Sequence, residues 1–200
     1  MNITTDLCRE EVLHNRQLWV KALRMPRCRK ATGVLDAGNG LRCCLGHGSY
    51  ALGVQRWSFL IKSDKTGRLK FNYAYGEEQT PAQAPREFVR LVGLRTSSGD
   101  LNSSYPVPRR FSCFSNSVNS LTALNDDTTH TPQMIADFLE RNITGELTEV
   151  HTPFIPLSTY PSNPEWKAPR EGKRPIVQTT AIKLTEKNKV NGDIDILEKE

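Results

Sequence analysis

Two adjacent cysteines, Cys43 and Cys44, are the residues of this chain best suited by type and spacing to chemistry. They follow a glycine-containing turn and open a run of small residues, 44–52, that predicts a short helix with Gly53 as a left-handed stop. Free N–H groups and the helix dipole at a helix start stabilise a thiolate. The pair is therefore either an activated nucleophile or two small apolar side chains packed in a core.

The nucleophile interpretation has a specific form. Cys44-Leu45-Gly46 resembles the cysteine-x-glycine nucleophile segment of papain-like cell-wall endopeptidases. That resemblance implies a thiol hydrolase in which Cys44 or Cys43 attacks, and in which His151, or else His130, is the base. Arg42 stands where those families carry an acidic residue, and no strand-like run precedes His151. The packing interpretation is therefore preferred, with the hydrolase as the alternative.

A small structural zinc domain is a further alternative. Cys44 and His47 have a usable ligand spacing, but a structural site typically shows two such pairs and the chain has no second one. No cofactor is expected. The residues that would complete four zinc ligands are Cys8, Cys28, Cys43, Cys113 and His151.

Several polar residues are candidates for a ligand-binding site. Asn125-Asp126-Asp127 resembles a fragment of a metal-binding loop, but it lacks the acidic spacing and terminal glutamate of a calcium site. Helix-capping turn chemistry is the better interpretation of this segment. The candidate ligand-binding residues are His47, Asn125, Asp126, Arg24 and Arg27.

A long first helix is predicted to position the cysteine segment. Residues 5–24 show helical periodicity, with Thr4, Thr5 or Asp6 as the cap and Pro26 as the stop. The helix at 44–52 carries little side-chain bulk, so another backbone must pack closely against it. Trp19 on the first helix is the expected contact.

The rest of the chain alternates short strands and helices. Strands are predicted at 57–62 and 69–73, a helix from Pro85 that closes at Gly93, and an exposed loop at 97–108. A helix pair follows: Val118, Leu121 and Leu124 line the first helix, and Thr131 with Pro132 begins the second.

The predicted fold is therefore a single compact α+β domain, residues 5–150, built of short helices and a small antiparallel sheet. Residues 151–200 are predicted to form an extended proline-rich tail, because six of the twelve prolines lie between Pro153 and Pro175. Residues 176–184 can form one edge strand of the sheet.

Composition limits the functional classes. The chain has 200 residues, a hydrophobic content of 37%, a charged content of 24% and a net charge of +5. We expect no membrane segment, because no apolar run approaches roughly 18 residues. The five unevenly spaced cysteines and the polar start favour a cytoplasmic protein with reduced thiols. Nucleic acid is not an expected partner, because no convincing recognition helix follows the helix pair.

Several separated motifs follow one another along the chain: Trp19-Val20-Lys21-Ala22-Leu23, Cys43-Cys44-Leu45-Gly46-His47, Leu124-Asn125-Asp126 and Ile135-Ala136-Asp137-Phe138-Leu139-Glu140. This series resembles a group of small uncharacterised proteins encoded by tailed bacteriophages and prophages. The resemblance spans residues 17–142 and implies an origin but no mechanism. Because the sequence shows no complete catalytic set and has a long tail suited to wrapping a partner, the expected function is that of a non-enzymatic phage accessory protein, which binds a host protein or a small ligand in the host cytoplasm.

Overall fold

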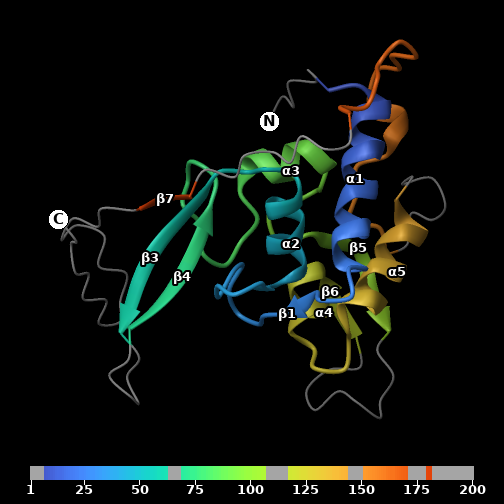
Figure 1. The fold of residues 1–200 in the computed structure, drawn as a ribbon. Coiled ribbons are helices and arrows are strands. Elements are labelled where there is room, and N and C mark those ends of the chain that lie inside the picture. The colour runs from blue at the N-terminus through green and yellow to red at the C-terminus, as the bar shows by residue number, and fades with distance from the viewer. Residues whose placement is uncertain (1–6, 63–68, 107–116, 144–150, 171–178, 182–200) are drawn as a thin grey trace.

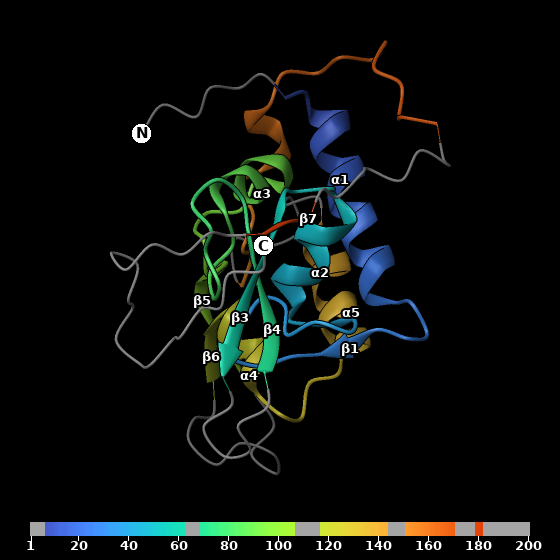
Figure 2. The ribbon, with the colours of Figure 1, turned by 60° about the vertical axis from the view of Figure 1, so that its left-hand side comes forward.

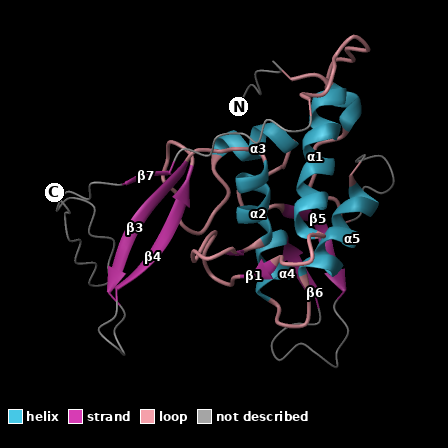
Figure 3. Cartoon of the chain, viewed as in Figure 1, coloured by secondary structure: helices cyan, strands magenta, loops and turns pink. Residues whose placement is uncertain are grey.

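The computed structural model describes residues 7–62, 69–106, 117–143, 151–170 and 179–181 (Figures 1 and 3). The fold is α+β, as predicted. The helices are α1 (Arg9–Leu23), α2 (Cys44–Ala51), α3 (Arg86–Val92), α4 (Leu121–Asp126) and α5 (Pro132–Asn142), with a 3-10 turn at Leu157–Thr159. The strands are β1 (Arg29–Lys30), β2 (Leu41–Arg42), β3 (Arg56–Lys62), β4 (Leu69–Tyr75), β5 (Asp100–Pro106), β6 (Ser117–Ser120) and β7 (Thr179–Ala181).

The strands form small sheets. β3 pairs antiparallel with β4, as predicted, and β7 pairs parallel with the other side of β3, opposite Arg56–Ser58. The β7 strand lies inside the predicted 176–184 strand and at a sheet edge. β5 pairs antiparallel with β6, and the two-residue strands β1 and β2 pair parallel.

The helix α2 lies between α1 and the β3–β4 hairpin (Figures 1 and 2). The predicted contact with the first helix is confirmed: the Trp19 indole N–H donates to the Cys44 carbonyl at 2.8 Å. Gly48 allows this close approach, because a Cβ there would lie 2.5 Å from the Phe88 ring and 2.8 Å from Trp19. The predicted stop is also confirmed, since Gly53 has φ +73°. Buried side chains from all five helices meet in one core.

Two local predictions are wrong. The first helix begins at Arg9 after Cys8, and the predicted caps Thr4, Thr5 and Asp6 lie outside the described residues. Leu7 is buried against the segment around Leu157 instead of extending the helix.

The second error concerns the loop predicted at 97–108, because residues 100–106 of it form β5, while 107 and 108 lie outside the described residues. Val118 lies in its partner β6 and not on the α4 face. The two strands are polar, so they lack the alternation that marks a half-buried strand. Thr131 and Pro132 begin α5 as predicted, with Thr131 Oγ1 accepting from the Met134 N–H at 3.2 Å.

The first part of the predicted tail packs on the domain. Phe154 is buried in the core, and Leu157 and Tyr160 pack against Val12 of α1. The boundary at residue 150 itself remains a prediction.

Candidate functional site

Cys43 and Cys44 lie at the start of α2, as predicted, and both are buried in the core. Cys43 is the N-cap residue, and its sulfur accepts from the Gly46 N–H at 3.4 Å. The Cys44 thiol donates to the Leu121 carbonyl oxygen of α4 at 3.6 Å. Both cysteine sulfurs therefore take part in hydrogen bonds within the fold.

Burial dominates the acidity of these thiols. It raises the pKa of Cys43 to about 12 and the pKa of Cys44 well above its usual value. Hydrogen bonds from the first turn of α2 lower the pKa of each thiol but do not outweigh burial. At neutral pH both side chains are protonated, so neither is an activated nucleophile.

His151 lies in a different environment, against β5. Its Nδ1 is 3.1 Å from the Ser103 hydroxyl and 3.2 Å from the Ser103 carbonyl oxygen, and its ring meets the Tyr105 ring edge-on at 5.4 Å. Among the described residues, no hydrogen bond joins His151 to Cys43 or Cys44. A carbonyl oxygen accepts only from a protonated nitrogen, so this contact favours a proton on Nδ1. An Nδ1 that carries a proton cannot take the hydroxyl proton of Ser103.

The structure does place another cysteine next to an imidazole, in a contact between Cys28 and His47 that was not predicted as a pair. The Cys28 sulfur lies 3.2 Å from His47 Nε2, which is also 3.0 Å from the Arg29 carbonyl oxygen. The same argument places the proton on Nε2, and burial lowers the pKa of His47 and raises that of Cys28 to about 11. This pair is a neutral, structural contact at neutral pH.

Of the proposed zinc ligands, His47 and Cys28 lie in contact, whereas the Cys44 thiol contacts Leu121. In the part of the chain that the structure describes, no three side chains of the metal-binding types form a group. Cys113 lies outside the described residues.

Asn125 and Asp126 bind the backbone of their own fold. Asn125 Oδ1 accepts from the Cys44 N–H at 2.9 Å, and its Nδ2 donates to the Ala31 carbonyl oxygen at 2.8 Å. Asp126 Oδ1 accepts from the Gly33 N–H at 3.2 Å. Asn125 thus supplies an acceptor for the start of α2 from 81 positions along the chain.

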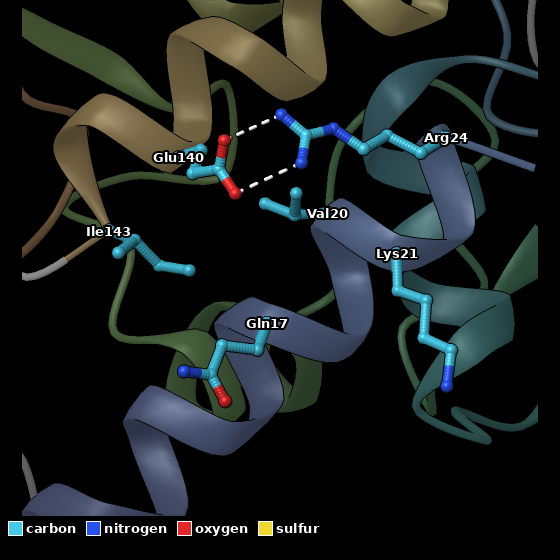
Figure 4. A pocket seen from close by; sticks show the side chains of 6 residues that line it. All are labelled: Gln17, Val20, Lys21, Arg24, Glu140 and Ile143. Atoms are coloured by element: carbon cyan, nitrogen blue, oxygen red, sulfur yellow. Dashed lines mark hydrogen bonds and ion pairs between the residues drawn. The ribbon is translucent and has the colours of Figure 1, made fainter.

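Arg24 lines a groove between α1 and α5 (Figure 4). Its guanidinium reaches across to Glu140 with two hydrogen bonds, of 3.0 and 2.6 Å, and to Asp137 at 2.8 Å. Arg27, the other predicted basic residue, is exposed. The groove has a volume of about 270 Å³ and is lined by Gln17, Val20, Lys21, Arg24, Glu140 and Ile143.

Sequence reasoning identified one lining residue of this groove, Arg24. Helical periodicity could have predicted the other lining residues of α1. Gln17, Lys21 and Arg24 recur at intervals of four and three residues, which places them on one face of that helix. Periodicity alone does not state that α5 packs beside that face.

Comparisons with protein-family models, with curated proteins and with solved structures find no match to this chain. None of the helices in the described residues has the length and apolar character needed to cross a membrane.

Proposed function

We propose that this chain is a phage accessory protein that acts by binding a host protein in the host cytoplasm. The origin is proposed from the motif series that includes Cys43-Cys44-Leu45-Gly46-His47. The observation that carries a binding function is the groove between α1 and α5, where Val20 and Ile143 provide apolar surface beside charged side chains. The thiols that would carry catalysis are instead buried and protonated, and no observation favours the hydrolase or the zinc domain.

The groove suits a protein partner better than a buried small ligand. Pockets that enclose drug-sized ligands have volumes of roughly 300–1,000 Å³ and bury most of the ligand. A groove of about 270 Å³ is smaller than these pockets. It is large enough for one apolar side chain of a partner, with Arg24 and Glu140 held in place at the rim by their two hydrogen bonds.

Filling the groove tests the proposal. Gln17 is an exposed lining residue of α1, so Gln17→Trp fills the groove without removing a core contact. Gln133→Trp on α5 is the matched control, because Gln133 is exposed and does not line the groove. The full chain, immobilised, is exposed to host lysate, and each captured protein is identified by mass spectrometry.

We expect a host protein that the wild type and Gln133→Trp retain and that Gln17→Trp loses, with loss of at least tenfold in affinity when the purified partner is titrated. Equal capture by Gln17→Trp and Gln133→Trp would contradict a role for the groove. Hydrolysis of a thioester or peptide substrate by the wild type, abolished in Cys44→Ala, would contradict the non-enzymatic function.

A further inference from the structure

A second group of charged side chains lies where α2 meets the β3–β4 hairpin. Asp36 is fully buried, and its Oδ2 accepts from Arg42 Nε at 2.8 Å and from the Tyr75 hydroxyl at 2.7 Å and forms an ion pair with Arg56 Nη2 at 3.0 Å. Its second oxygen accepts from the Gly38 N–H at 2.8 Å. We call Asp36, Arg42, Arg56 and Tyr75 the Asp36 cluster.

The contacts of the Asp36 carboxylate come from within the fold. Its Oδ2 accepts from Arg42 Nε and from the Tyr75 hydroxyl and forms the ion pair with Arg56, and its Oδ1 accepts from the Gly38 amide. Asp36 therefore neutralises one positive charge while two guanidinium groups face it.

The two arginines are largely removed from water. The side chains of Arg42 and Arg56 are 11% and 13% exposed, and no other carboxylate among the described residues pairs with either. Burial by itself would lower the pKa of Arg42, but Tyr75 and Asp36 outweigh it and raise the net pKa, so the charge is retained. An unbalanced buried charge is costly unless further interactions stabilise it.

Aromatic rings supply part of that stabilisation. The Arg42 guanidinium lies 3.8 Å from the centre of the Tyr50 ring, and that of Arg56 lies 3.4 Å from the centre of the Tyr73 ring. Such contacts stabilise a cation, but less than a network of charge-assisted hydrogen bonds does. Arg56 Nε is buried and has no hydrogen-bond partner among the described residues.

We propose that Arg42 and Arg56 form a binding site for an oxyanion, a phosphate or carboxylate group, of a ligand whose ring packs beside Tyr50. One anion balances the single excess positive charge, and guanidinium groups match the geometry of both oxyanions. Tyr50 is 41% exposed, so it offers aromatic surface at the edge of the cluster. This site is separate from the α1–α5 groove and does not depend on the proposed function.

Calorimetric titration of the full chain tests the site with inorganic phosphate, citrate and AMP at constant ionic strength. The wild type is expected to bind at least one of these oxyanions, and AMP more tightly than phosphate. Arg56→Gln is expected to weaken binding about 10- to 100-fold, the loss of one charge-assisted hydrogen bond set. Arg95→Gln is the control of equal charge change, because Arg95 is exposed and lies outside the cluster.

Tyr50→Leu tests the contribution of the ligand's ring to affinity separately from that of its oxyanion. It leaves every hydrogen bond of Asp36 in place, so it is expected to reduce AMP affinity severalfold and to leave phosphate affinity unchanged. If Arg56→Gln does not fold by circular dichroism, protection of Arg42 and Arg56 from phenylglyoxal by phosphate in the wild type takes its place. Absence of binding by all three oxyanions, or equal binding by wild type and Arg56→Gln, would overturn the proposal.

Discussion

A single buried arginine holds three parts of the chain together. Arg16 of α1 is fully buried and donates to the carbonyl oxygens of Val92 and Ile155 at 2.8 Å each, and to that of Ile143. Val92 ends α3 and Ile143 follows α5, so the cation meets the negative ends of two helices. Burial lowers the pKa of Arg16 to about 10, which still leaves the side chain charged at neutral pH.

Replacing Arg16 with methionine is expected to be strongly destabilising. Arg16→Met keeps an apolar stem of similar length but leaves three acceptors without their donor, at about 1–3 kcal/mol each where they stay buried. We expect the free energy of unfolding in urea to fall by at least about 3 kcal/mol. Gln17→Met, one residue along on the exposed face, is expected to change it by less than about 0.5 kcal/mol. A loss below 1 kcal/mol in Arg16→Met would show that the three carbonyls find other partners.

The buried thiol of Cys43 predicts lower stability in alkali. Its pKa is raised from 9.0 to about 12 in the folded chain, so the folded state holds this proton more tightly than the unfolded state does. The stabilisation is complete below about pH 9 and is lost as the pH rises towards 12. At pH 10.5 the loss from this thiol is about 2 kcal/mol relative to pH 7.5, at roughly 1.4 kcal/mol per pH unit.

Other groups also titrate in this range, so a matched variant isolates the thiol. Cys43→Ser keeps an N-cap acceptor for the Gly46 N–H but has no ionisation near pH 10. Urea unfolding under reducing conditions is expected to show a smaller alkaline loss in Cys43→Ser than in the wild type. Identical losses in the two proteins would mean that Cys43 is not protonated and buried.

At the scale of the element, α2 depends on its glycines for contact and not for flexibility. Alanine is a better helix former than glycine by about 1 kcal/mol, so propensity alone predicts that Gly46→Ala and Gly48→Ala stabilise the chain. Packing predicts the opposite. A Cβ at Gly46 would overlap the Leu35 carbonyl, which is backbone, and one at Gly48 would lie 2.5 Å from the Phe88 ring.

Overpacking of this kind typically costs 1–3 kcal/mol, so it outweighs propensity. We expect Gly48→Ala to lower the melting temperature and Gly46→Ala to lower it further, because backbone yields less than a ring. Ala51→Gly at the last residue of the same helix is the control, with an expected loss of no more than about 1 kcal/mol from propensity. A rise in melting temperature for either alanine variant, measured by circular dichroism, would contradict close packing on α2.

The elements that the sequence predicted well carry local signals. The helix α3 has Pro85 before it and a left-handed Gly93 after it, and α2 ends before Gly53 in the same way. Strands β5 and β6 were missed because polar residues dominate both. The apolar residues of β5 that pack against the core, Leu101 and Tyr105, are four positions apart with the exposed Ser103 between them, so they do not form a period-two pattern.

The site features that were missed depend on partners far along the chain. Arg16 binds acceptors 76 to 139 positions away, and Asn125 binds Cys44 81 positions away. The Asp36 cluster joins β2, β3 and β4 around one loop residue. No local pattern marks an arginine as buried, because arginine is usually exposed. The sequence pattern therefore predicted where α2 starts. It did not predict that the Cys44 thiol donates a hydrogen bond to Leu121 of α4, or that the Cys43 sulfur accepts one from Gly46 in the first turn of α2.

At the scale of the whole molecule, the chain folds back on its first helix. Phe154 meets the Trp19 ring edge-on at 6.2 Å and lies under the Arg16 guanidinium at 4.2 Å. The Ile155 N–H donates to the Gly93 carbonyl oxygen at 2.8 Å, and the Arg9 N–H donates to the Pro161 carbonyl oxygen at 2.9 Å. The segment 151–161 therefore closes one side of the core, although its proline content is typical of a linker.

This packing predicts a sharp difference between two truncations. A chain that ends at Val150 loses Phe154, Leu157 and Tyr160, and it exposes the apolar surface that these side chains bury against α1. Fully burying one such side chain stabilises a fold by about 1.5–3 kcal/mol, so the three together approach the whole stability of a typical domain. We expect the chain ending at Val150 to lose its cooperative unfolding transition.

A chain that ends at Arg170 retains these contacts and loses the three-residue edge strand β7 among the described elements. We expect it to unfold cooperatively, with a melting temperature within a few degrees of the full chain, as followed by circular dichroism and tryptophan fluorescence. A folded chain ending at Val150 would place the domain boundary where the sequence predicted it. Loss of the cooperative transition in the chain ending at Val150, but not in the chain ending at Arg170, instead means that the fold requires the contacts that Phe154, Leu157 and Tyr160 make with the rest of the core.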